Sequence, residues 1–164
     1  MRIRWKGLEL PSKVVVEESS GEPINYAKFV VEPFERGFGV TVGNSLRRVL
    51  LAGLEGSAVT GIKIDNVLHE FSSIEGVLED VTEIVLNVKN LVVKLEGDDA
   101  RTVVIERGEK GEVKAGDIQT DPNVEIINKD LVLCTLTADI DFRMEMTVSR
   151  GRGFVTGEEN IREG

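Results

Sequence analysis

The sequence predicts an α+β protein made of two parts. Two segments show the three-to-four-residue hydrophobic spacing of helices, whereas most of the rest consists of short alternating segments separated by turn-forming residues. Such a pattern predicts few helices and mostly antiparallel strands. We expect the boundary between the two parts near Gly56, so that residues 1–56 and 57–164 form separate domains.

The composition is that of an ordinary globular protein: 41% of its 164 residues are hydrophobic and 30% are charged. The net charge of -9 argues against direct contact with nucleic acid, because domains that bind DNA or RNA alone are normally basic. The sequence contains no run of about 18 apolar residues, so no membrane span is predicted. Cys134 is the only cysteine, so no intramolecular disulfide can form, and we expect a cytoplasmic location.

The chain is predicted to open with an antiparallel hairpin. Residues 13–17 and 26–32 are rich in β-branched and aromatic side chains, and residues 18–25, with Gly21 and Pro23, are typical of a turn. Pro33 ends the second strand.

A helix is expected over residues 39–54. One face carries an apolar stripe: Val42, Leu46, Val49, Leu50 and Gly53. Another face carries Asn44, Arg47, Arg48 and Leu51. Thr41 or Asn44 is expected to cap the start, and Gly56 is expected to stop the helix.

The next elements are a strand over residues 58–65, a connector around His69, and a second helix over residues 76–91. The helix is predicted to have Glu79 and Asp80 in its first turn and Lys89 in its last, which suits the helix dipole. Its apolar stripe is Val77, Val81, Ile84, Val85 and Val88. Since valine is a poor helix former, burial must hold this helix.

The rest of the chain is predicted to be strands, at residues 92–96, 102–106, 113–115, 124–127, 131–136 and 140–149. The last one alternates strictly, with Ile140, Phe142, Met144, Met146 and Val148 on one side, which indicates a half-buried strand. The tail from residue 150 loses this pattern, so we expect a turn at "RGRGF" and fraying beyond it.

The sequence holds weak signals for two kinds of catalytic site. Gly37, Gly39 and Gly43 precede or open a helix, but their spacing is G-x-G-x-x-x-G, whereas the dinucleotide motif is G-x-G-x-x-G. A small nucleotide-binding enzyme using this stretch stays as the alternative. His69 is the only histidine, which disfavours a zinc site or a catalytic triad, so no catalytic residue, metal or cofactor is expected.

The helix with Arg47 and Arg48 leaves two interpretations open. Both arginines could simply face water. Alternatively the helix binds another protein, because arginine is enriched among binding hot spots and suits bidentate pairing with carboxylates.

Longer sequence motifs help to decide between the solvent-facing and the protein-binding interpretation. The stretches "EPFERGFGVTVGNSLRRVLL" and "GSAVTGIKIDNVLHEFSSIEGVLEDVTEIVLNVKNLVVKL", with "NVEI" and "RGRGF" further on, resemble the amino-terminal domain of bacterial RNA polymerase alpha subunits. The resemblance covers about residues 25–155. It implies an incomplete dimerisation domain, made of the hairpin and the arginine helix, and an inserted, mostly antiparallel β domain with one main helix.

The resemblance also implies a function in assembly. Two alpha chains pair, one binds the beta subunit and the other the beta-prime subunit, and the catalytic site with its metal ions lies in those larger subunits. Neither nucleic acid nor a membrane is an expected partner of this segment.

Individual roles follow from the matched positions. Arg48, Leu51, Glu83 and Lys89 match positions that contact the beta subunit. The stripe of Val42, Leu46, Val49 and Leu50 matches residues packed in the dimer interface. Gly37 and Gly39 would shape the turn that leads into the helix. Family members continue beyond the insert with strand and a long helix of the dimerisation domain, so we expect this chain alone to dimerise weakly or not at all.

Overall fold

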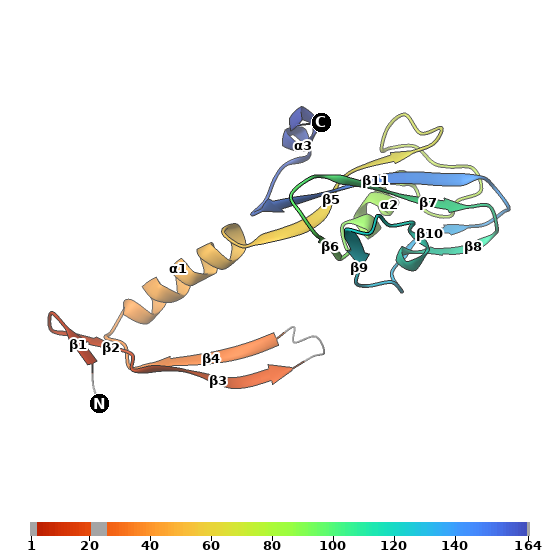
Figure 1. Cartoon of the computed structure of the whole chain (residues 1–164). Helices are drawn as coiled ribbons and strands as arrows, with labels where there is room; N and C mark the ends of the chain where they lie inside the picture. Colours follow the sequence, from red (N-terminus) through yellow and green to blue (C-terminus); the bar gives the residue numbers. More distant parts are fainter. Residues whose placement is uncertain (1–2, 21–25, 164) are drawn as a thin grey trace. The chain divides into compact units, whose positions relative to one another are not determined.

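The structure is a computed structural model that describes residues 3–20 and 26–163. The chain divides into two compact units, Met1–Leu51 and Ala52–Gly164. Figure 1 labels the elements of each. Antiparallel sheets dominate and helices are few, so the predicted α+β class is confirmed.

The first unit holds two antiparallel ribbons and most of helix α1 (Phe38–Ala52). Strand β1 (Ile3–Trp5) pairs with β2 (Leu8–Leu10), and β3 (Lys13–Ser20) pairs with β4 (Tyr26–Glu32). The β3–β4 hairpin confirms the prediction for this region. Its predicted turn, with Gly21 and Pro23, lies in part outside the described residues.

Helix α1 confirms the predicted helix, but the predicted caps are wrong. Thr41 and Asn44 lie inside the helix, because the chain turns earlier, at Gly37, where φ is 94°. The Thr41 hydroxyl donates back to the Gly37 carbonyl at 3.4 Å. Gly56 does not stop the helix either, since it belongs to strand β5 and pairs with Gly151.

The second unit is built on a three-stranded antiparallel sheet in the order β5–β11–β7 (Figure 1). Its strands are β5 (Glu55–Ile64), β11 (Phe142–Arg152) and β7 (Arg101–Arg107). The predicted alternation in the central strand is confirmed. Phe142, Met144, Met146 and Val148 are buried, and the residues between them are exposed or half-buried.

Two smaller antiparallel pairs complete the strands of this unit. Strand β10 (Val132–Leu136) pairs with β8 (Gly111–Lys114), and β6 (Val93–Leu95) pairs with β9 (Val124–Ile126). The helices are α2 (Val81–Val88), the short 3-10 helix η1 (Ala115–Asp117) and α3 (Gly157–Glu163). Among the described residues, no helix has the length and apolar character that crossing a membrane requires.

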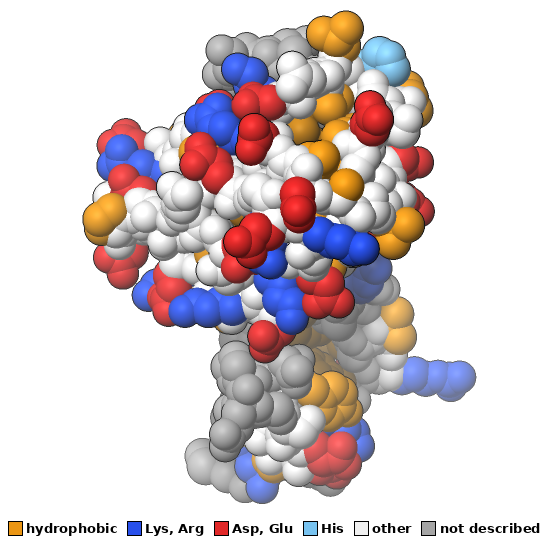
Figure 2. Space-filling view, turned by 90° about the vertical axis from the view of Figure 1, so that its right-hand side faces the viewer, with side chains coloured by type: hydrophobic (Ala, Val, Ile, Leu, Met, Phe, Trp, Pro, Cys, Tyr) orange, Lys and Arg blue, Asp and Glu red, His pale blue; other side chains and the backbone are white. Residues whose placement is uncertain are grey.

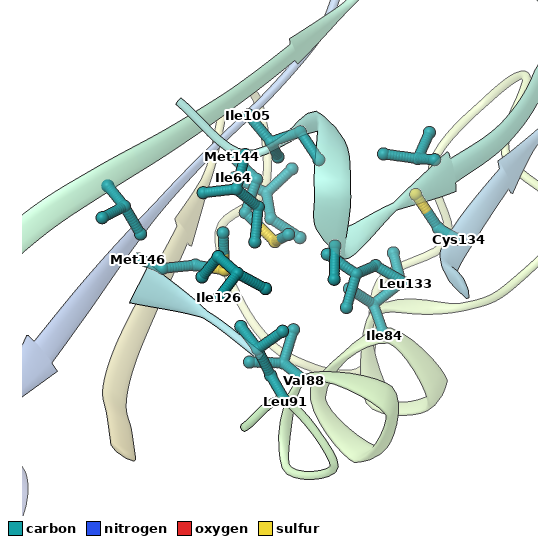
Figure 3. Packing of buried hydrophobic residues seen from close by; sticks show 14 of the residues in the cluster. Ile64, Ile84, Val88, Leu91, Ile105, Ile126, Leu133, Cys134, Met144 and Met146 are labelled. Carbon is teal, nitrogen blue, oxygen red and sulfur yellow. The ribbon is translucent and has the colours of Figure 1, made fainter. Parts of the chain in front are cut away.

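The hydrophobic core lies in the second unit. Every buried hydrophobic residue of the described chain falls between Ile64 and Val148. Ile84 of α2 points toward the strands near Leu133, and Val88 lies beside Leu91 (Figure 3). The predicted α2 stripe is confirmed for Val81, Ile84 and Val88, which are buried, and for Val85, which packs on the core partly exposed. Val77 also packs on the core, but it lies before the helix.

The second helix is shorter than predicted, because the residues before it have other partners. Val77 forms a bridge with Leu136 in β10. Both oxygens of the Glu79 carboxylate accept hydrogen bonds from Thr135, from its backbone N–H at 2.6 Å and its hydroxyl at 3.0 Å. Asp80 is therefore the N-cap rather than part of the first turn, and Lys89 is the C-cap.

The tail also differs from the prediction. Strand β11 continues through Arg152, and the chain turns at Gly153, where φ is 71°. Helix α3 then forms instead of fraying. Glu159 stabilises its start by accepting hydrogen bonds from the backbone and hydroxyl of Thr156, at 2.9 and 3.1 Å.

Candidate protein-binding surfaces

Helix α1 is apolar on one side but has no buried residue at all. The residues of its predicted stripe, Val42, Leu46, Val49 and Leu50, are all exposed. Amphipathic helices in globular proteins normally turn such a stripe toward a core. Because the described residues bury none of these side chains, the stripe is available to another protein surface.

The three glycines of this region do not form a phosphate-binding loop. Gly37 lies in the turn before α1, but Gly39 is the second residue of the helix and Gly43 its sixth. A phosphate cradle needs consecutive loop residues whose backbone N–H groups converge. The geometry does not support the nucleotide-binding alternative.

Arg47 and Arg48 are exposed on α1, and neither forms a hydrogen bond or ion pair with any described residue. The sequence of the helix contains no acidic residue that could neutralise them. Leu51, one turn beyond Arg48 and Arg47, is 61% exposed. This side of α1 therefore combines positive charge with an uncovered apolar side chain.

The β3–β4 hairpin is uncovered on both faces. Val14 and Val16 alternate with Val15 along β3, yet all three are exposed, as are Tyr26 and Phe29 of β4. A two-stranded hairpin is marginally stable by itself in water. Most of the hairpin's large apolar side chains are thus exposed, although Val30 and Val31 of β4 are half-buried.

In the second unit, helix α2 exposes the two charged residues predicted to bind a partner. Glu83 is also part of a capping box: its N–H donates to Asp80 Oδ1 at 2.7 Å, and its Oε2 accepts from the Asp80 N–H at 3.3 Å. Lys89 is exposed at the C-cap. Leu86, between them, is 54% exposed.

The connector beside α2 adds apolar surface that the sequence analysis missed. Leu68 is 96% exposed and Phe71 is 80% exposed. Hydrogen bonds from the Thr82 hydroxyl to Glu70 O (2.9 Å) and from Val81 N–H to Ser72 O (3.1 Å) hold the connector against the start of the helix. Figure 2 shows hydrophobic side chains gathered beside the single histidine of this connector. The sequence signal that could have revealed this surface is the presence of two large apolar residues, Leu68 and Phe71, inside an otherwise polar connector.

Several charged residues of the second unit pair with one another. Arg143 contacts Glu145 at 2.6 Å, Glu106 at 2.9 Å and Asp65 at 3.9 Å. The hydrogen bonds to Glu106 and then Glu145 raise the pKa of the Arg143 guanidinium above its ordinary value. These carboxylates act as partners of a surface arginine. Within the described ranges, no group of three His, Cys, Asp or Glu side chains is placed to hold a metal ion.

Comparisons with known proteins give a consistent result. The family model described as "RNA polymerase Rpb3/RpoA insert domain" matches residues 62–164. The chain is 57% identical over 160 residues to DNA-directed RNA polymerase subunit alpha of Rhodopirellula baltica, covering 98% of the chain and 48% of that protein. It is 60% identical over 137 residues to the subunit alpha of Desulforudis audaxviator, covering 84% of the chain and 44% of that protein. The chain spans about half the length of these curated relatives.

Proposed function

Since the chain belongs to the family of the RNA polymerase Rpb3/RpoA insert domain, we propose that it acts as an alpha subunit of bacterial DNA-directed RNA polymerase. In this role it pairs with a second alpha chain and serves as the scaffold on which the beta and beta-prime subunits assemble. Residues 1–56 contribute the amino-terminal part of the dimerisation domain, and residues 57–164 form the insert domain.

One observation carries the proposal: among its described residues, the first unit has no buried hydrophobic side chain, although both its helix and its hairpin are rich in apolar side chains. Each large apolar side chain stabilises a complex by about 1.5–3 kcal/mol when it becomes fully buried. A unit of this kind is stable only when other polypeptide surfaces cover it, which is the expected property of an assembly subunit.

The wide stripe of α1 suits the contact between two alpha chains. Val42, Leu46, Val49 and Leu50 are uncharged and lie on one face, so the stripe can pack against its own copy in a two-fold dimer without bringing like charges together.

The other side of α1 suits a different subunit. Arg48 has no acidic neighbour in its helix, and Leu51 is exposed beside it. We assign both to the beta-subunit contact, with Glu83 and Lys89 of α2 as further contacts. Glu83 keeps Oε1 available for a partner, because the capping box uses Oε2.

Catalysis belongs to the larger subunits in this account. The chain needs no cofactor of its own, and this segment makes no contact with nucleic acid, which agrees with the net charge of -9. The cytoplasm is the proposed location.

A pull-down with the purified beta subunit tests the proposal. The protein at its natural length should retain beta, and Arg48→Ala should weaken retention strongly, because truncating a hot-spot arginine costs on the order of 2 kcal/mol or more. Ser45→Ala is the matched control. Among the described residues, the Ser45 hydroxyl donates to Thr41 O within the helix and to no other group, so this variant should bind like the original.

Circular dichroism establishes that all three proteins are equally folded. If the folded, unmodified protein fails to retain beta, the proposed function is wrong. Equal retention of Arg48→Ala and Ser45→Ala would remove Arg48 from the contact while leaving the subunit assignment in place.

A further inference from the structure

Helix α1 carries a second, mixed apolar and basic face in addition to the wide apolar stripe. Val40 precedes Asn44, Arg47, Arg48 and Leu51 by four, seven, eight and eleven positions. At 3.6 residues per turn these spacings return to one side of a helix. The wide stripe lies on the other side of the same helix. Val40 therefore shares a face with the arginines and not with Val42.

Val40 is strongly exposed. Its exposed fraction is 71%, compared with 36% for its neighbour Val42 and 61% for Leu51. At a rise of 1.5 Å per residue, the eleven positions from Val40 to Leu51 cover about 16 Å of helix. The face therefore has an apolar side chain at each end and two guanidinium groups in its second half.

Charge limits what can occupy this face. Arg47 and Arg48 have no ion-pair partner among the described residues, and the helix supplies no acidic residue. A second copy placed on the same face by two-fold symmetry would bring these arginines against their counterparts, and like charges in contact disfavour binding. The face suits a different polypeptide, whose surface offers an apolar pocket bordered by carboxylates.

We propose that Val40, Arg48 and Leu51 form one continuous docking face on α1, with Val40 as an apolar anchor that fits a pocket of the beta subunit bordered by acidic residues. This inference rests on the proposed function, and it adds a contact residue that no matched motif assigns. The face then extends along almost the whole helix. The opposite stripe, with Val42, is left for the second alpha chain.

Val40→Asn tests the assignment, with Ser45→Asn as its matched control. Valine, serine and asparagine have similar helix propensities, so both variants should keep the helix. Both place the same neutral side chain on α1, but Ser45 lies outside the face that carries Val40 and Leu51. The protein at its natural length is used, with the beta subunit of the same organism as the binding partner.

Two quantities are measured: the dissociation constant for beta, by surface plasmon resonance, and the dimer dissociation constant, by sedimentation. Val40→Asn should weaken beta binding about tenfold, while dimerisation stays within about twofold of the original. Ser45→Asn should leave both constants within about twofold.

Other outcomes separate the inference from the proposed function. If Val40→Asn binds beta like the original while Arg48→Ala does not, Val40 is outside the contact and the inference is wrong. If Val40→Asn loses dimerisation instead, the occupant of this face is a second copy and the inference is again wrong. If the original protein does not bind beta, the proposed function itself fails.

Discussion

Replacing Ile84 by alanine should destabilise the second unit by about 2–5 kcal/mol, the range for deleting a large aliphatic side chain from a close-packed core. Ile84 has an exposed fraction of 0% and points from α2 toward the strands near Leu133 (Figure 3). Helix α2 is eight residues long and contains three valines, so its intrinsic tendency to form a helix is low. We expect a value in the upper part of the range, since losing this contact weakens the helix as well as the core.

Urea unfolding followed by far-ultraviolet circular dichroism measures the change. Ile84→Val, which removes one methyl group, should cost about 0.5–1.5 kcal/mol. Leu86→Ala is the matched control on the same helix, and because Leu86 is exposed it should cost about 0.5 kcal/mol or less. Equal losses for Ile84→Ala and Leu86→Ala would refute the reasoning that burial holds α2.

Three further predictions concern single groups. Gly76→Ala should destabilise the second unit by more than Gly97→Ala in urea unfolding: both glycines have positive φ, but a Cβ at Gly76 would lie 2.8 Å from Ile140 Cγ2, whereas a Cβ at Gly97 meets nothing within 4 Å. Burial raises the pKa of the Cys134 thiol to about 12, so iodoacetamide should label it only in unfolded protein, and rapid labelling of folded protein would contradict its burial. Hydrogen bonds from the backbone N–H and then the hydroxyl of Thr156 lower the pKa of Glu159. The stabilisation that this carboxylate gives to the start of α3 should therefore be present above pH 4.5 and be lost as the pH falls through the lowered pKa. Nuclear magnetic resonance of the α3 amides measures the change, and an order of α3 that does not decrease with falling pH would contradict it.

The parts of the fold with a regular pattern were predictable from the sequence. The strict alternation around Met144 and Met146 reports a strand with one buried face, and β11 has that geometry at the centre of its sheet. The apolar spacing of α1 and α2 likewise located both helices, because hydrophobic residues recur every three to four positions along one face of an amphipathic helix.

The ends of these helices were not predictable, because contacts distant in sequence decide them. Glu79 reads as a first-turn residue, yet Thr135, 56 positions later, binds its carboxylate and keeps it outside α2. Gly56 reads as a helix stop, yet its pairing with Gly151 places it in a strand. Local propensity has no information about such partners.

For the candidate surfaces, too, the sequence predicted the local arrangement of residues but not the effects of the rest of the chain. Spacing alone placed Arg48 and Leu51 on one face and the stripe of Val42 on another. It did not reveal that the whole of α1 lacks buried residues, or that the connector exposes Leu68 and Phe71 beside α2. Exposure depends on what the remaining chain covers, and only the structure supplies that.

Hydrogen–deuterium exchange of α1 tests the central claim, that this helix is covered by other polypeptides in the working protein. Exchange is compared between the free protein and its complex with the beta subunit, with the buried strand β11 as an internal reference. We predict that α1 amides become protected on assembly while those of β11, already protected, do not change. Unchanged exchange of α1 in a complex of demonstrated stoichiometry would contradict the account.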